Sequence, residues 1–267
     1  MLQYYNDLPY TVAVVGAGSG IGKATAELIG AMDVSVGCLD KNGDAAEDTA
    51  RTIESAGGKA CSYAMEVTDP ASAKSALDHV EDILGSISGL VNCAGITGKT
   101  AVLGADVDLD DFDQVHNINL RGALVVSQAV LPGMLTRGYG RLLHVASISG
   151  KEGNSGMLAY STSKAGLIGM VKVLGKDYAE SGVTINAIAP AVVRTPMVDV
   201  LPDETVSYMT DKIPMNRCCE LSEVAQLIAG KEFAHTRHQV VAAHVRDLRV
   251  KAEFLGECCD VFCTGVG

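Results

Sequence analysis

The chain has 267 residues, a length that suits one large domain better than two. Hydrophobic residues make up 48% of it and charged residues 20%, the balance of an ordinary globular protein. The net charge of −11, without a basic stripe, argues against nucleic-acid binding. No uncharged apolar stretch approaches about 18 residues, so we expect no membrane span.

The N-terminal residues and the cysteines indicate a cytoplasmic protein. Residues 1–10 lack the basic start and apolar run of a signal peptide. The eight cysteines include no Cys-x-x-Cys pair, which disfavours both a disulfide framework and a zinc ribbon. His235-x2-His238 with Cys258-Cys259 matches no standard zinc spacing, so no metal site is expected.

Short apolar runs predict six strands, each followed by a helical pattern. The strands are expected at residues 11–15, 34–39, 60–67, 90–93, 141–146 and 183–188. The helices are expected after the glycine turn at 16–22 and at about 43–56, 71–84, 110–138, 156–179 and 221–228, with Asp110 or Asp111 as the cap of the fourth. Because strands and helices alternate, the sequence predicts an α/β fold with a doubly wound parallel sheet.

The character of the chain changes after residue 230. This tail holds three of the six histidines, three of the four phenylalanines and three of the eight cysteines. One helical pattern runs through 240–254, and residues 258–267 show no clear period.

A glycine turn follows the first strand, with the spacing Gly16-x3-Gly20-x-Gly22. Glycines there allow a pyrophosphate to approach the backbone, and the start of the next helix can hold it. Asp40 ends the second strand about twenty residues later, where a carboxylate can accept a hydrogen bond from a ribose 2′-hydroxyl. The same carboxylate would repel a 2′-phosphate, which favours NAD over NADP.

Tyr160 and Lys164 lie four residues apart in a predicted helix and should share one face. A neighbouring ammonium favours phenolate, so we expect a lowered pKa for Tyr160 and a role in proton transfer. Ser147 ends the fifth apolar run, where its hydroxyl could hold a substrate oxygen opposite the tyrosine.

Together these features resemble the classical short-chain dehydrogenase/reductase family. The matching segments are Gly16-x3-Gly20-x-Gly22, Asn92-Cys93-Ala94-Gly95, Asn119, Ser147, Tyr160-x3-Lys164 and Pro190 through Thr195-Pro196. The resemblance covers residues 8–229 and implies a Rossmann-type fold in a single domain, 1–267, with a divergent segment at 230–267. The family's last strand, which completes the sheet edge and packs against a partner subunit, is not recognisable after Ile228. The tail is therefore either divergent or frame-altered.

The resemblance also implies roles for individual residues. Tyr160 would be the general acid/base, Lys164 would lower its pKa and bind the nicotinamide ribose, and Ser147 would hold the substrate carbonyl. Asn119 would keep a water in a proton relay leading to Lys164. The positions expected to contact the NAD cofactor are Gly16, Ser19, Gly20, Ile21, Gly22, Asp40, Glu66, Val67, Asn92, Ala94, Gly95, Tyr160, Lys164, Pro190, Val193 and Thr195.

The implied activity is NAD-dependent interconversion of a secondary alcohol and a ketone. The stretch Gly150–Asn154 beside Ser147 resembles that of sugar-acid dehydrogenases, and residues 197–215 are expected to form a lid over a sugar, sugar acid or polyol. Two alternatives stay open: a 3-oxoacyl-carrier-protein reductase, and a non-catalytic NAD-binding sensor or scaffold. By resemblance the protein would be a homo-oligomer, a tetramer.

Overall fold

The computed structural model describes residues 10–195, 198, 207, 210–211 and 213–233, with the backbone alone at 231–233, 242–243 and 259–262. Its sheet has the strand order β3-β2-β1-β4-β5-β6-β8-β7. The six parallel strands are β1 Thr11–Val15, β2 Ser35–Asp40, β3 Lys59–Ala64, β4 Ile87–Asn92, β5 Gly140–Val145 and β6 Val183–Pro190. The predicted doubly wound parallel sheet is therefore confirmed.

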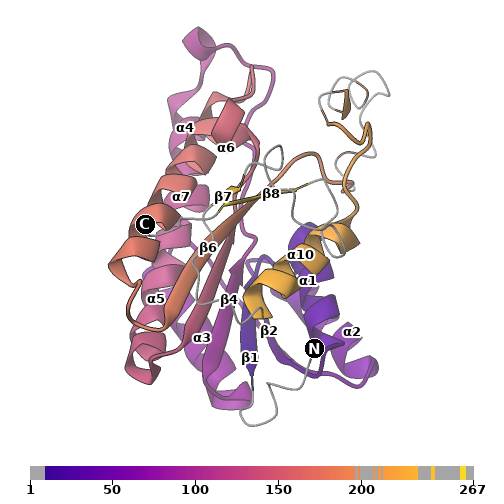
Figure 1. Ribbon diagram of the computed structural model, residues 1–267, viewed down its shortest axis with the longest axis vertical. Coiled ribbons are helices and arrows are strands. Elements are labelled where there is room, and N and C mark those ends of the chain that lie inside the picture. The colour runs from indigo at the N-terminus through magenta and orange to yellow at the C-terminus, as the bar shows by residue number, and fades with distance from the viewer. Residues whose placement is uncertain are drawn as a thin grey trace.

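Helices cover both faces of this sheet (Figure 1). One layer contains α1 Gly20–Gly30, α2 Gly43–Ser55 and α10 Leu221–Phe233. The other contains α3 Pro70–Leu84, α4 Leu109–His116, α5 Gly122–Arg137 and α7 Leu158–Asp177. A single-turn helix, α6 Ser149–Glu152, precedes α7, and a short 3₁₀ turn, η1 Gly104–Asp106, precedes α4.

The two layers enclose separate cores, one on each side of the sheet. Leu142 packs into the core beneath α3, α5 and α7, whereas its neighbour Leu143 packs into the core beneath α1, α2 and α10. Both side chains are only 1% exposed. Strands buried on both faces need apolar residues at every position, which is why unbroken apolar runs predicted them.

The strand order places the crevice for a ligand. From β1 the chain winds outward through β2 to β3, and it then returns to β4 on the other side of β1. In a doubly wound sheet, ligands bind at the carboxyl ends of the strands where the winding reverses. This crevice lies between β1 and β4, directly above the glycine turn.

The expected helix over 110–138 is interrupted. A π-helical turn, η2 Asn117–Arg121, separates α4 from α5, and the cap is Asp108, whose carboxylate accepts from the backbone N–H of Asp110. The predicted cap at Asp110 or Asp111 was wrong because the helix is capped two or three residues earlier. The third strand also stops at Ala64, three residues before its expected end, so Glu66 and Val67 follow the strand.

The described part of the tail contains two short strands. β8 Cys259–Phe262 runs antiparallel to β6 and pairs Pro190 with Cys259, and β7 Ala242–Ala243 runs antiparallel to β8. A strand thus does flank β6, opposite in direction to the six others. Ala242–Ala243 falls within the expected helix at 240–254, and there that prediction was wrong; the rest of that pattern, most of the expected lid, and His235 and His238 lie outside the described residues.

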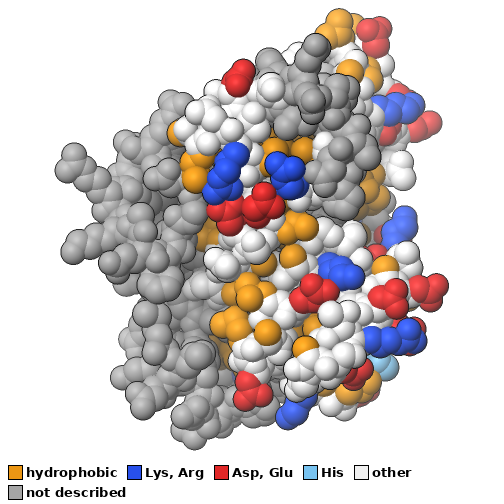
Figure 2. Space-filling view, turned by 90° about the vertical axis from the view of Figure 1, so that its right-hand side faces the viewer, with side chains coloured by type: hydrophobic (Ala, Val, Ile, Leu, Met, Phe, Trp, Pro, Cys, Tyr) orange, Lys and Arg blue, Asp and Glu red, His pale blue; other side chains and the backbone are white. Residues whose placement is uncertain are grey.

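One described helical stretch, Leu109–Arg137, is long and apolar enough to cross a membrane. Half of its most apolar window is buried inside the domain, as expected for the core helix of a globular protein. The face bearing α1, α2 and α10 intersperses acidic, basic and apolar side chains (Figure 2), and its described side chains form no basic patch. The five cysteines with described side chains form no disulfide.

Candidate active site

The glycine turn joins β1 to α1 and is shaped by its lack of side chains. Gly16 and Gly20 have φ angles of +81° and +52°, which disfavour any residue with a Cβ. A Cβ at Gly22 would overlap the carbonyl oxygen of Gly16, whereas one at Gly20 would meet nothing within 4 Å. Ser19 is exposed at the N-cap of α1 without a side-chain capping bond, and Ile21 packs against the core beside α1. The turn is thus tightly closed at Gly22 and open at Gly20.

Asp40 lies against this turn at the end of β2. Its Oδ2 accepts from the Gly18 N–H at 3.0 Å, and its Oδ1 accepts from the Asn42 N–H at 2.9 Å. A Cβ at Gly18 would lie 2.9 Å from Oδ2. The carboxylate is therefore held at a fixed place beside the turn.

The segment after β4 closes the other side of the crevice. The Asn92 side chain is buried, and its Oδ1 accepts from the Ala94 N–H at 3.1 Å. A Cβ at Gly16 would lie 3.0 Å from the Ala94 nitrogen. A Cβ at Gly95 would lie 3.1 Å from Asn119 Oδ1 and 3.2 Å from Lys164 Nζ. The Ala94–Gly95 segment therefore lies between the glycine turn, which it approaches at Ala94, and the predicted catalytic residues, which it approaches at Gly95.

Glu66 and Val67 follow β3 at the same end of the sheet. The Glu66 carboxylate is exposed and accepts from the N–H and the hydroxyl of Thr68, at 3.1 and 3.0 Å. Val67 is buried, and a Cβ at Gly122 would lie 2.9 Å from its Cγ2. Val67 thus packs against the start of α5, and the Glu66 carboxylate is hydrogen-bonded within its own turn.

Asn119 is buried in the π-helical turn. Its side-chain amide forms a reciprocal pair with the Ile96 backbone, accepting from N–H and donating to C=O at 2.8 Å each. It also donates to Ser163 Oγ at 3.0 Å, and Ser163 donates to the Tyr160 carbonyl at 2.7 Å. Ser163 was not predicted as a site residue, although it lies one turn from Tyr160 and next to Lys164. The amide is therefore joined to the helix that carries Tyr160.

Ser147, Tyr160 and Lys164 meet at the carboxyl end of β5. The Ser147 hydroxyl is buried, accepts from the Ser149 N–H at 3.2 Å, and is hydrogen-bonded to the Tyr160 side chain. Lys164 is 4% exposed, and its Nζ donates to the Val145 carbonyl at 2.8 Å. That Nζ lies 5.8 Å from the centre of the Tyr160 ring. The predicted shared face of Tyr160 and Lys164 is confirmed.

The pKa of Tyr160 shifts opposite to the expected direction. Burial raises the pKa of the phenol, and the hydrogen bond from Ser147 opposes this rise only partly. Burial also lowers the pKa of Lys164 to about 8. Loss of hydration disfavours both charged forms. The prediction of a lowered tyrosine pKa was therefore wrong.

Pro190, Val193 and Thr195 leave β6 at the same end of the sheet. The Pro190 carbonyl accepts from the Ile148 N–H at 3.0 Å, which joins β6 to the segment after Ser147. Val193 is buried, and its backbone forms an isolated parallel β-bridge with Cys219, just before α10. Thr195 is half-buried, and its carbonyl accepts from the Val198 N–H at 2.8 Å.

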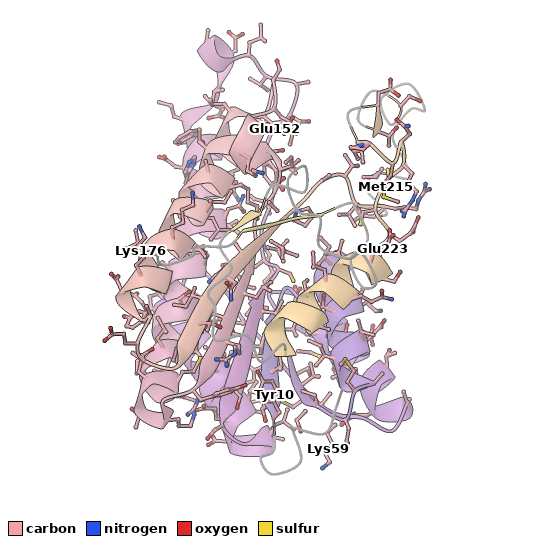
Figure 3. All side chains as sticks on the ribbon, viewed as in Figure 1. Tyr10, Lys59, Glu152, Lys176, Met215 and Glu223 are labelled. Atoms are coloured by element: carbon pink, nitrogen blue, oxygen red, sulfur yellow. The ribbon has the colours of Figure 1, made fainter. Side chains whose placement is uncertain are left out.

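Glu152 at the end of α6 and Met215 before α10 lie toward this carboxyl end of the sheet (Figure 3). Among the residues the structure describes, no group of three His, Cys, Asp or Glu side chains could hold a metal ion.

Comparison of the sequence with known proteins identifies the family. The family model described as short chain dehydrogenase matches residues 10–205. The chain belongs to the short-chain dehydrogenase family. The predicted family membership is thus confirmed, and the protein is an oxidoreductase acting on CH–OH groups, in a family that uses NAD(P) and small-molecule substrates.

Individual relatives cover most of the chain. A 2-dehydro-3-deoxy-L-rhamnonate dehydrogenase (NAD(+)) of Sphingomonas sp. (strain SKA58) is 40% identical over 84% of this chain and 89% of its own length. The 3-oxoacyl-[acyl-carrier-protein] reductase of Thermotoga maritima is 36% identical over 85% of this chain and 93% of its own. A (3R)-3-hydroxyacyl-CoA dehydrogenase of Rattus norvegicus is 32% identical over 81% and 86%.

Proposed function

We propose that this protein is an NAD-dependent dehydrogenase that interconverts a secondary alcohol and a ketone on a sugar acid. The observation that carries the proposal is the Tyr160 side chain hydrogen-bonded to Ser147, with the buried Lys164 beneath it at the carboxyl end of β5. A hydroxyl pair of this kind can hold one carbonyl oxygen by two hydrogen bonds. Asn119, joined to the same helix through Ser163, completes the proposed catalytic set.

The glycine turn fits a dinucleotide. The space beside Gly20, where a Cβ would meet no atom within 4 Å, leaves the start of α1 open to a pyrophosphate. Asp40 would bind the adenosine ribose, and Val67 and Ala94 would line the adenine side. Pro190, Val193 and Thr195 would border the nicotinamide. When bound, the nicotinamide supplies the hydride acceptor or donor.

The chain's own residues would then handle the substrate oxygen and its proton. Ser147 would donate a hydrogen bond to the substrate oxygen. Tyr160 would take the hydroxyl proton during oxidation and give it back during reduction. The Lys164 ammonium would stabilise the phenolate, and we propose that Asn119 connects Lys164 to solvent through a bound water.

Asp40 supports a preference for NAD over NADP. Its Oδ2 accepts from the Gly18 N–H at 3.0 Å, which holds the carboxylate beside the glycine turn, where it would repel the 2′-phosphate of NADP bound in the proposed way. The relative from Sphingomonas carries NAD(+) in its name. Lys41 follows Asp40 directly and could attract a phosphate. NADP is therefore the necessary comparison in every assay.

A sugar acid is favoured as substrate by residues 150–154 and by that same relative. Asn154 is exposed, and its Nδ2 donates to Ser149 Oγ at 2.9 Å, two residues from Ser147. A 3-oxoacyl-carrier-protein reductase is the second candidate, favoured by the 36% identical relative from Thermotoga maritima. A non-catalytic NAD sensor is disfavoured because all four predicted catalytic side chains meet in one place.

A substrate panel tests the proposal. NADH or NADPH formation would be followed by absorbance with sugars, sugar acids, polyols and a 3-hydroxyacyl thioester, each with NAD and with NADP. We expect the highest kcat/KM for a sugar acid with NAD. Faster turnover of the thioester would favour the second candidate, faster turnover with NADP would contradict the role of Asp40, and NADH binding without any turnover would favour the sensor.

We further propose a single catalytic domain that acts in the cytoplasm as a homo-oligomer. The continuous sheet supports one domain, and the family membership supports self-association and a cytoplasmic location. Light scattering coupled to gel filtration measures the mass in solution directly. A purely monomeric peak would contradict the oligomer.

A further inference from the structure

Three buried polar side chains lie beneath the proposed site and take no part in the proton chemistry above. Asn92 ends β4, His144 lies in β5, and Ser127 lies in α5. Their exposed fractions are 3%, 0% and 0%. Buried polar groups are costly unless paired, so a connected set of this kind needs an explanation.

The hydrogen bonds of this set have only one consistent direction. Ser127 donates its single hydroxyl proton to the Ala123 carbonyl at 2.7 Å, so its oxygen must accept from His144 Nε2, 3.1 Å away. His144 Nδ1 then carries no proton and accepts from Asn92 Nδ2 at 3.2 Å. The bond from the Ala94 N–H to Asn92 Oδ1 ends the chain of bonds.

This direction decides how the Asn92 amide is turned. If the amide were reversed, its NH₂ group would face the Ala94 N–H and its oxygen would face the lone pair of His144 Nδ1. Both contacts would be repulsive in a buried site. His144 therefore selects the one orientation in which Asn92 can hold Ala94.

Ala94 and Gly95 are the point at which this network reaches the site. The Ala94 nitrogen lies where it would be 3.0 Å from a Cβ on Gly16 of the glycine turn. Gly95 leaves room only for the Asn119 amide and the Lys164 ammonium beside it. A change in the Ala94–Gly95 backbone would thus disturb the dinucleotide crevice and the catalytic residues together.

We propose that His144 is a positioning residue for the dinucleotide crevice, acting through Asn92 on the Ala94–Gly95 turn. This proposal rests on the proposed function in one respect, that the crevice binds a nicotinamide dinucleotide. Only the neutral imidazole with its proton on Nε2 can do this, because a second proton on Nδ1 would face the NH₂ group of Asn92. Burial, aided by the charge on Lys164, lowers the pKa of His144 to about 4 and keeps it neutral at physiological pH.

Two substitutions separate positioning from packing. In His144→Asn the side-chain oxygen can take the place of Nδ1 and accept from Asn92. In His144→Gln the longer side chain places its NH₂ group near the former position of the His144 Nε2. The glutamine can therefore donate to Ser127 but cannot accept from Asn92. Packing alone favours Gln because it leaves the smaller cavity.

The readout is the dissociation constant of NADH, measured by its fluorescence on binding. We expect His144→Gln to weaken binding about tenfold, the effect of one lost hydrogen bond, and His144→Asn to remain within about threefold of the wild type. Thr11→Val is the matched control, since it removes a buried hydroxyl bonded to the Leu84 carbonyl at the amino end of β1. It should lower stability without changing the NADH affinity.

Equal affinities for the Asn and Gln variants, or tighter binding by Gln, would overturn the proposal. The tautomer gives a second test that needs no variant: ¹⁵N NMR should find His144 protonated on Nε2 and not on Nδ1, and the reverse would also overturn it. Absence of NADH binding by the wild type would instead overturn the proposed function. The two failures are therefore distinguishable.

Discussion

At the scale of single residues, loss of hydration determines the pKa shifts of the proposed catalytic pair, Tyr160 and Lys164. The spacing of Tyr160 and Lys164 predicted correctly that they share a helix face, but not the direction of the tyrosine pKa. Nζ is 5.8 Å from the centre of the ring and is bonded to the Val145 carbonyl, while both groups are buried. Burial depends on what packs above the helix, which local spacing does not contain.

The pH dependence of the reaction follows from these two groups. In the proposed mechanism, oxidation needs the Tyr160 phenolate. Its raised pKa makes the phenolate scarce at neutral pH, so the oxidation rate should rise about tenfold per pH unit. Oxidation also needs the Lys164 ammonium, which is lost as the pH rises through its pKa of about 8. We therefore expect kcat/KM for oxidation to rise up to about pH 8 and then level off. Above that pH the Tyr160 phenolate still becomes more abundant, but the Lys164 ammonium is lost at the same rate.

Reduction should behave differently, because it needs the protonated phenol. Its kcat/KM should be level below about pH 8 and fall above it as Lys164 loses its charge. Measured profiles of the two directions in the same buffers decide this. A level oxidation rate between about pH 6 and pH 8 would contradict the assignment of Tyr160 as the base.

At the scale of elements, patterns located the strands but missed an interruption. Apolar periodicity continues across η2, since the π-helical turn replaces α-helical bonds without exposing the apolar face. The sign in the sequence was a group of polar residues within an apolar helix, Asn119 among them. The buried partners of the site, Ser163 and His144, were missed because a serine or histidine beside a motif carries no signal until the packing is known.

The glycine turn gives an element-scale prediction. Gly22→Ala should destabilise the fold by about 1–3 kcal/mol, because the methyl group would overlap the Gly16 carbonyl. Gly20→Ala should lower the free energy of unfolding by about 1–2 kcal/mol. Its methyl group would meet no atom within 4 Å, so the loss comes from the φ of +52° alone. Both should weaken NADH binding, Gly20→Ala because its methyl enters the proposed pyrophosphate site.

Urea unfolding and NADH titration of the two glycine variants provide the measurements. NADH affinity is the sharper readout for Gly20→Ala, because its fold should be largely intact. Unchanged NADH affinity in Gly20→Ala would argue against a dinucleotide at this turn. A Gly22→Ala variant as stable as the wild type would mean that the turn can open.

At the scale of the whole molecule, alternation of apolar runs and helices was sufficient to predict the doubly wound sheet and the end at which the site lies. Parallel strands buried on both faces leave a strong signal in the sequence, and motifs after β1, β4, β5 and β6 converge at one edge. The antiparallel β8 beside β6 was not predicted. Its residues lack an apolar period, and pairing at a sheet edge depends on the partner strand as much as on the strand itself.

The most direct test of the proposed site is the substitution Tyr160→Phe, which removes one oxygen atom and leaves the ring. NADH formation from the best sugar acid should fall by about 10²–10⁴-fold, the usual contribution of a general acid or base, while the dissociation constant of NADH stays within about threefold. Tyr63→Phe, on the exposed side of β3, is the matched control and should retain full activity. Turnover of Tyr160→Phe at the wild-type rate would contradict the account.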